Sequence, residues 1–302
     1  MNWLELTLEI ENELADDIAT ALMPYMEGGV SITSSRIQDD ESSGHAAGPM
    51  LLRAYIRGDE KLEETREKIE RALWFLGRIH PLPEPTYTWI PEQEWQTSWR
   101  EHYHPIKVGE KLMIIPAWET LPDPEKISIL IDPGMAFGTG AHPTTRLCLT
   151  ALESFLQPGD RVADLGAGSG ILSIAARKLG AASVDGWDID PGTIAVAERN
   201  AALNQVDGLH FSTGKLTNLL QSPGVPYDLL LANILAHVLT EMIDEELVTA
   251  IRPGGLMIMS GILSEQLPPI LKKLELAGMT ILNVIEAESW IVVVAKKLPS
   301  IK

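Results

Sequence analysis

Three glycines alternate in the run R-V-A-D-L-G-A-G-S-G at residues 161–170: Gly166, Gly168 and Gly170. A short apolar segment, Val162 to Leu165, precedes them and a helical pattern, Ile171 to Leu179, follows. This order predicts a strand, a tight turn and a helix N-terminus. Glycine reaches backbone angles closed to other residues and lets a ligand approach bare main chain, while free N–H groups at the helix start favour an anionic group. A ligand-binding turn and a purely structural turn are both consistent with this run.

Two polar residues further along the chain favour the ligand-binding interpretation. Asp188 ends a predicted strand, Ser183 to Asp188, eighteen residues beyond Gly170, where nucleoside-binding sheets place a carboxylate for the ribose hydroxyls. Asn233 follows the apolar segment Tyr227 to Ala232. It faces the crevice at the carboxyl end of a central strand, although an Asn is also a common turn former. The glycine spacing is G-x-G-x-G rather than the G-x-G-x-x-G of dinucleotide sites, which favours a ligand such as S-adenosylmethionine over NAD.

The elements around these residues predict an α/β, Rossmann-like domain. Helices are expected at 193–204, with Asp190 as its N-cap, at 237–251, and from Ser264 or Glu265 to Ala277. The remaining strands are expected at 209–212, 256–260, 280–285 and 290–296. Residues 286–289 are too few for a parallel crossover, so the last two strands form an antiparallel hairpin. A mostly parallel seven-stranded sheet with such a terminal hairpin is similar to the class I methyltransferase fold.

The first ninety residues predict a separate α+β module. Strands are expected at 3–10, 30–37, 50–56 and 86–90, and helices at 12–25 and 59–75, which is the ferredoxin-like order βαββαβ. Residues 39–49 read as a loop. Residues 1–100 contain 19 Asp and Glu against 9 Lys and Arg. The module is either a docking surface for a basic protein or an acidic, solvated surface without a partner.

Residues 91–105 form the predicted bridge between the two domains. Trp95, Trp99 and Tyr103 lie four residues apart, as on one face of a linker helix that packs between domains. His102 and His104 have no third ligand at convincing spacing, so no metal site is expected. A hairpin at 106–118 and a strand at 127–131 lead to the Gly- and Pro-rich stretch Asp132–Arg146, which is expected to form a wall or lid of the same pocket.

Composition limits the protein class. The formal net charge of −18 over 302 residues argues against direct nucleic-acid binding, since such proteins carry clustered Lys and Arg. The single cysteine, Cys148, rules out an internal disulfide and a cysteine-based zinc cluster. The N-terminus has no secretory signal pattern, and the most apolar segment, 229–239, is too short to span a bilayer. A soluble, cytoplasmic protein is expected.

Several motifs together resemble the PrmA-type methyltransferases of the large-subunit ribosomal protein eleven. They are D-P-G-M-A-F-G-T-G-A-H-P-T-T, D-L-G-A-G-S-G-I-L, D-I-D-P, A-N-I-L and S-G-I-L-x-x-Q, in that order along the chain. The resemblance implies a ferredoxin-like substrate-recognition domain at 1–90, a linker helix at 91–105 and an S-adenosylmethionine-dependent methyltransferase domain at 106–302. Ala141 and Ala167 depart from residues common in the family, a Thr and a Cys respectively, and residues 39–49 match it poorly.

The resemblance also implies a set of site residues. It gives cofactor contacts to Thr145, Gly166, Asp188 and Asn233, beside Gly168 in the same turn, and makes Phe137 the aromatic residue that helps to enclose the cofactor. It further implies trimethylation of lysine side chains and of the N-terminal amine of the ribosomal protein, whether free or on the ribosome.

The expected chemistry is transfer of a methyl group to a neutral amine, with Asn233 as the catalytic residue that orients the reacting groups. Burial beside a sulfonium would lower the pKa of the substrate amine, because desolvation and like charge both disfavour the ammonium. No side chain is singled out as a general base, and proton loss to water suffices. Two alternatives remain open: a lysine methyltransferase of another protein, and a non-catalytic ribosome-binding protein that retains the fold. The chain lacks the G-x-G-x-x-G spacing that an NAD-dependent oxidoreductase would need.

Overall fold

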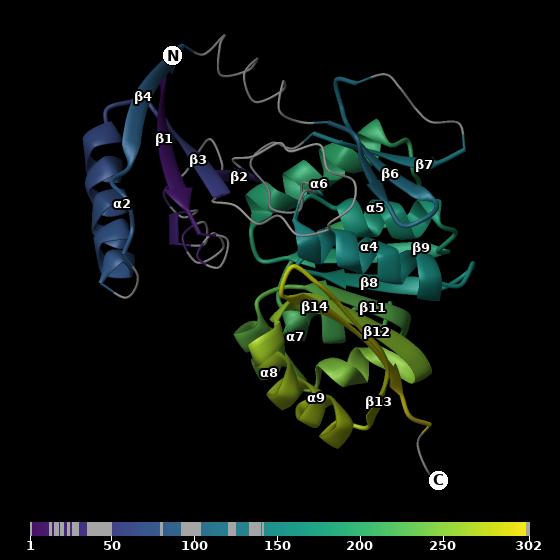
Figure 1. Cartoon of the computed structure of the whole chain (residues 1–302). Coiled ribbons are helices and arrows are strands. Elements are labelled where there is room, and N and C mark those ends of the chain that lie inside the picture. The colour runs from purple at the N-terminus through teal and green to yellow at the C-terminus, as the bar shows by residue number, and fades with distance from the viewer. Residues whose placement is uncertain are drawn as a thin grey trace. The chain divides into compact units, whose positions relative to one another are not determined.

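The computed structural model divides into two compact units, Met1–Tyr103 and His104–Lys302 (Figure 1). The residues described are 2–11, 14, 18, 21–22, 25, 30–34, 50–78, 81–91, 104–119, 125–132, 140 and 142–299. The expected helix at 12–25 lies largely outside this part of the chain, and so do the linker helix and the loop at 39–49.

The first unit contains a four-stranded antiparallel sheet in the order β2-β3-β1-β4. Its elements are β1 (Asn2–Ile10), β2 (Val30–Ser34), β3 (Met50–Arg57), α2 (Leu62–Gly77) and β4 (Thr86–Pro91). Alternate residues of β1, from Leu4 to Ile10, are buried with Ile69 and Leu73 of α2, as the period-2 pattern predicts. The strand order confirms the ferredoxin-like prediction. The helix begins three residues later than expected, because Asp59 forms a turn in which its side chain accepts the N–H of Lys61 at 2.8 Å.

The second unit is built on a seven-stranded sheet in the order β10-β9-β8-β11-β12-β14-β13. Its strands are β8 (Arg161–Leu165), β9 (Ser183–Asp188), β10 (Leu209–Thr213), β11 (Tyr227–Asn233), β12 (Ile251–Leu263), β13 (Met279–Ala287) and β14 (Trp290–Lys297). The first five run parallel, whereas β14 is antiparallel to both β12 and β13. This arrangement confirms the expected fold class, including the terminal hairpin.

Helices cover both faces of this sheet (Figure 1). They are α4 (Pro143–Phe155), α5 (Ile171–Lys178), α6 (Pro191–Leu203), α7 (Leu216–Leu220), α8 (Ala236–Asp244) and α9 (Leu267–Leu276). Val162 and Leu229 pack with α4 and α5, whereas their neighbours Ala163 and Leu230 pack with α7, α8 and α9. Because both faces are buried, the central strands are continuously apolar rather than alternating.

A small three-stranded sheet, β5-β6-β7, packs outside α4 and α5. It comprises β5 (Ile106–Val108), β6 (Leu112–Pro116) and β7 (Ile127–Ile131). β5 and β6 form the expected hairpin, and β7 pairs parallel to β6. Every residue of β6 is buried. α4 and α5 therefore lie between the two sheets. After β7, the chain continues directly into the stretch that begins at Asp132.

Two predicted boundaries in the second unit are wrong: the end of the helix expected at 237–251 and the start of the strand expected at 256–260. The helix expected at 237–251 ends at Asp244, where Glu246 adopts a left-handed φ of 70° and a short 3-10 helix, Leu247–Ala250, follows. Ile251 is instead the first residue of β12, because it pairs with Tyr227 on the central strand. α7 was not predicted from the sequence. Within the part of the chain that the structure describes, no helix is long and apolar enough to cross a membrane.

Candidate functional site

Three of the predicted site residues meet where the order of the parallel strands reverses. Leu165 at the end of β8 pairs with Trp187 on β9 and with Ala232 on β11. The next residue along each of these three strands is a predicted site residue: Gly166, Asp188 and Asn233. The chain proceeds from β8 to β9 and β10 on one side, and returns through β11 and β12 on the other. Ligands of open α/β sheets bind at the carboxyl ends of strands at such a switch point.

The glycine turn depends on backbone conformations that other residues adopt with difficulty. Gly166, Gly168 and Gly170 have φ values of 76°, 55° and 80°. A Cβ on Gly166 would lie 2.3 Å from Cγ2 of Ile234, so a side chain there would collide with the residue after Asn233. Glycine at position 166 therefore allows the turn and the end of β11 to approach closely.

Asp188 is tied to the glycine turn through its carboxylate. Oδ2 accepts the N–H of Gly168 and Oδ1 accepts the N–H of Asp190, both at 3.1 Å. These bonds hold the half-buried carboxylate in one orientation. Each carboxylate oxygen can accept more than one hydrogen bond, so both oxygens remain able to receive a ligand hydroxyl. Asp190 caps α6 as expected, since its side chain accepts the N–H of Gly192 at 2.8 Å.

Asn233 and Thr145 carry polar side-chain atoms without a partner among the described residues. Asn233 is half-buried, and its amide makes no hydrogen bond there. Thr145 lies fully buried in the first turn of α4, and its Oγ1 makes no hydrogen bond to any described residue. Burying a hydroxyl without a partner is unfavourable, so a ligand atom would satisfy it. Phe137 lies outside the described residues.

Asp164, on β8 in the same region, is a carboxylate that was not predicted as a site residue. It is 1% exposed on β8, and its Oδ2 accepts a hydrogen bond of 2.6 Å from Ser173. Its Oδ1 has no partner in the described structure. Burial, reinforced by the charge of Asp188, raises the pKa of Asp164 to about 6, although the Ser173 bond opposes this. Its position within the apolar segment Val162 to Leu165 would have allowed Asp164 to be predicted as a site residue from the sequence.

Two further residues that were not predicted from the sequence, His142 and Trp290, lie at the N-terminus of α4, which also carries Thr145. The rings of His142 and Trp290 meet edge to face, with centroids 5.0 Å apart. His142 caps the helix, because its Nδ1 accepts the N–H of Thr144 at 3.2 Å. The N-cap of α4, three residues before Thr145, is therefore packed against an aromatic ring of β14.

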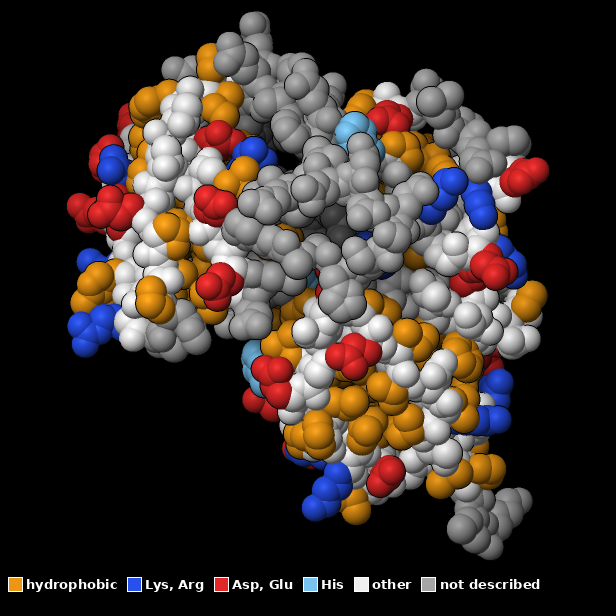
Figure 2. All heavy atoms as spheres, in the orientation of Figure 1, with side chains coloured by type: hydrophobic (Ala, Val, Ile, Leu, Met, Phe, Trp, Pro, Cys, Tyr) orange, Lys and Arg blue, Asp and Glu red, His pale blue; other side chains and the backbone are white. Residues whose placement is uncertain are grey.

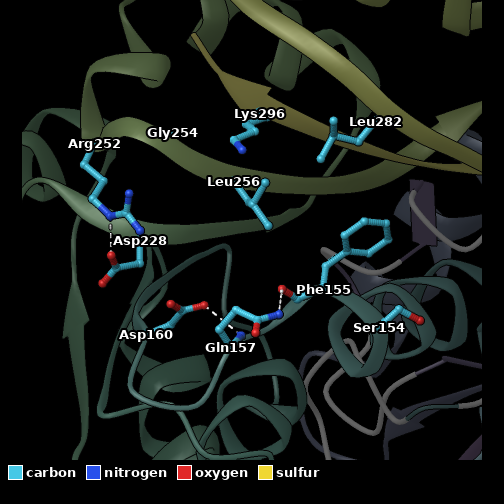
Figure 3. Close-up of a pocket in the computed structure, with 10 residues that line it drawn as sticks. All are labelled: Ser154, Phe155, Gln157, Asp160, Asp228, Arg252, Gly254, Leu256, Leu282 and Lys296. Atoms are coloured by element: carbon cyan, nitrogen blue, oxygen red, sulfur yellow. Dashed lines mark hydrogen bonds and ion pairs between the residues drawn. The ribbon is translucent and has the colours of Figure 1, made fainter. Parts of the chain in front are cut away.

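A separate cavity of about 290 Å³ lies at the opposite, amino ends of the strands (Figure 3). Its polar side chains form hydrogen bonds and ion pairs between the amino-terminal ends of neighbouring strands. Asp228, for example, accepts the N–H of Arg161 at 2.9 Å and pairs with Arg252. None of the residues predicted from the sequence lines this cavity, so it is distinct from the site at the glycine turn.

The sheet order, the terminal antiparallel hairpin and the glycine turn at the switch point define a class I methyltransferase. The family model of "Ribosomal protein L11 methyltransferase (PrmA)" matches residues 2–298. The chain belongs to this family, and it is an S-adenosylmethionine-dependent methyltransferase.

Individual relatives agree with this assignment. The ribosomal protein L11 methyltransferase of Chloroflexus aurantiacus is 38% identical, with 98% of each chain covered. That of Geobacillus kaustophilus is 37% identical over 98% of this chain and 100% of the relative. The crystal structure of the ribosomal protein L11 methylase from Lactobacillus delbrueckii subsp. bulgaricus has a TM-score of 0.60 and 37% identity, and covers 65% of this chain and 100% of that chain.

Proposed function

We propose that this enzyme methylates ribosomal protein L11, on lysine side chains and on the N-terminal amine. The observation that carries the proposal is the meeting of Asp188, the glycine turn and Asn233 at the switch point of a methyltransferase sheet. The substrate follows from the names of relatives that match nearly the whole chain. The alternative, another protein as the lysine substrate, would use the same cofactor residues.

The described residues fit S-adenosylmethionine. We assign the ribose hydroxyls to Asp188, whose two oxygens are oriented by backbone N–H groups and can accept further bonds. Gly166 and Gly168 let the cofactor approach bare main chain. The unpartnered Oγ1 of Thr145 is a contact for a polar cofactor atom, and Phe137 is assigned to enclose the cofactor. The buried carboxylate of Asp164 suits a site that holds a cationic ligand.

The chain's contribution to the reaction is position and a suitable environment for the amine. The cofactor, when bound, supplies an already activated methyl group. Asn233 is assigned to orient the substrate nitrogen, because its amide lies at the end of the central strand with no partner among the described residues. A buried site disfavours the ammonium and so lowers the pKa of the substrate amine. The proton leaves to water.

The N-terminal unit is proposed to recognise the substrate. We assign residues 1–90 to recognition, 91–105 to a linker helix and 106–302 to catalysis. Over residues 1–100 acidic side chains outnumber basic ones by 19 to 9, which suits a basic ribosomal protein. Trp74 and Phe75 of α2 are 58% and 60% exposed, and Figure 2 shows hydrophobic side chains among the acidic ones on the visible face of this unit. Docking would bury them.

The cellular setting follows from the same proposal. Ribosomal proteins are available in the cytoplasm, either free or assembled, and we place the enzyme there. The excess of negative charge, −18 for the chain, argues against direct contact with ribosomal RNA. Recognition is therefore expected to be protein to protein.

The decisive experiment incubates the enzyme with a labelled methyl donor and purified ribosomal proteins, followed by mass mapping of the product. Label on L11 amines is expected. Label found solely on other proteins would make the substrate assignment wrong. An Asp188→Ala variant should lose affinity for S-adenosylmethionine in a calorimetric titration, whereas Asp190→Ala, which removes the neighbouring helix cap, should retain it. Equal binding by the Asp188 variant and the natural enzyme would refute the ribose assignment, and tight binding of NAD would contradict the cofactor.

A further inference from the structure

Asn200 on α6 connects two segments of the cofactor site that are far apart in the sequence. Its side chain is 0% exposed. Its amide nitrogen donates to the carbonyl oxygen of Ser169 at 2.9 Å, within the glycine turn. Its Oδ1 accepts the N–H of Asp132 at 3.0 Å, where the chain leaves β7. One buried amide thus joins the glycine turn to Asp132, the first residue of the stretch that contains Thr145.

Asn204, four residues further on at the C-terminal end of α6, holds Leu130 of β7 but not the glycine turn. Its Oδ1 accepts the N–H of Leu130 at 2.9 Å, and its nitrogen donates to the carbonyl of Leu130 at 2.6 Å. The same nitrogen also lies 2.8 Å from the carbonyl oxygen of Asn200. Asn204 is 8% exposed. The two asparagines lie four residues apart and are similarly buried. Asn200 connects Asp132 to Ser169 of the glycine turn, whereas Asn204 holds Leu130 of β7.

Gly140, the next described residue after Asp132, lies close to the start of α5. This residue has a φ of 90°, and a Cβ on it would lie 2.4 Å from Cδ1 of Ile114 and 3.2 Å from Cδ1 of Ile171. Ile171 is the first residue of α5, directly after the glycine turn. Gly140 therefore has no room for a side chain beside the first residue of α5, and Asp132 donates its N–H to Asn200.

The position of Asn200 requires both a donor and an acceptor. Asp132 presents an N–H and Ser169 presents a C=O, so a carboxylate would satisfy the first and repel the second, and an apolar side chain would leave both unpaired. Leaving buried main-chain groups unpaired is unfavourable. Movement of Ser169 would in turn move Gly168, whose N–H orients Asp188.

We propose that Asn200 is a positioning residue for the cofactor site, which sets the glycine turn against the segment leaving β7. This inference rests on the cofactor pocket described under Proposed function. Asn204 anchors β7 and has no part in cofactor binding. Asn200 touches no reacting atom, and its effect reaches the cofactor through the turn.

The test compares Asn200→Ala with the matched control Asn204→Ala, using calorimetric titration with S-adenosylhomocysteine and thermal unfolding of the full chain. Both variants should unfold at lower temperature, because each loses buried hydrogen bonds. Asn200→Ala should bind the ligand about tenfold more weakly, and Asn204→Ala should stay within about threefold of the natural enzyme. Asn200→Asp, which keeps the acceptor for Asp132, should bind as weakly as Asn200→Ala and serves as the test variant if the alanine variant does not fold.

Two results would overturn the proposal: unchanged ligand affinity in Asn200→Ala, or an equal loss of affinity in the two alanine variants. Asp188→Ala is measured in parallel. Failure of the natural enzyme to bind, or full affinity in Asp188→Ala, counts against the assigned pocket. If Asp188→Ala binds the ligand weakly and Asn200→Ala binds it with unchanged affinity, the result counts against the role of Asn200 alone.

Discussion

Replacing Asp164 with Asn should make the stability of the methyltransferase unit less dependent on pH. Asp164 is 1% exposed, and its pKa is raised from 3.8 to about 6, chiefly by burial. The folded protein therefore binds this proton more tightly than the unfolded chain does. Protonated Asp164 therefore stabilises the folded state. This stabilisation is fully present below about pH 4 and is lost as pH rises through about 6. Asparagine has no proton to lose and keeps an acceptor for Ser173.

The size of the effect follows from the two pKa values. The difference between 3.8 and about 6, at about 1.4 kcal/mol per pKa unit, corresponds to about 3 kcal/mol. Relative to Asp164→Asn, the natural enzyme should lose about this much free energy of unfolding between pH 4 and pH 8. Other titrating groups are common to both proteins and cancel in the comparison.

Amide hydrogen exchange followed by mass spectrometry measures this difference within the correct unit. Amides of the buried strand β8, Arg161–Leu165, should exchange through unfolding of the whole unit. After correction for intrinsic exchange rates, protection in the natural enzyme should fall relative to the variant as pH rises from 4 to 8. A constant difference across this range would refute the reasoning, because it would show that Asp164 does not titrate there.

Three further predictions concern neighbouring residues. Thr145→Val should weaken S-adenosylmethionine binding about tenfold in a calorimetric titration, yet leave the free energy of unfolding within about 1 kcal/mol, because Oγ1 has no partner among the described residues; a destabilised variant would contradict this. Cys148 should resist iodoacetamide at pH 8 until the protein is denatured, since burial raises the pKa of its thiol; rapid labelling of the folded enzyme would count against this. Gly166→Ala should lose cofactor affinity and more stability than Gly159→Ala, because both positions have positive φ but an added Cβ meets Ile234 at 166 and nothing within 4 Å at 159; chemical denaturation that gave equal losses would show that the contact with Ile234 is unimportant.

The local pattern was sufficient for much of the site. The glycine turn, Asp188 and Asn233 could be selected because each directly follows an apolar strand, and parallel strands place their carboxyl ends at one edge. The structure brings these residues to the same level of the sheet. Their contacts with the cofactor, and the role of Asn233, stay predictions.

Element boundaries were predicted less well where tertiary pairing overrides local preference. The helical pattern from His237 to Ile251 gave no sign that the helix ends at Asp244. Ile251 joins β12 because Tyr227 on the central strand offers it a pairing partner, and such a partner cannot be read from the local sequence.

The sequence by itself determined the order of elements, the family and the residues at the strand ends, because these depend on short-range periodicity and on motifs of contiguous residues. The tertiary structure decided the surroundings of Asp164 and the partners of Asn200. Asp164 has a raised pKa because α5 and the neighbouring strands exclude water from it. Asn200 and Asp132 are 68 residues apart in the chain. Their hydrogen bond forms because the fold places the end of β7 beside α6. Burial and long-range contact are properties of the assembled chain, so no local pattern in the sequence contains them.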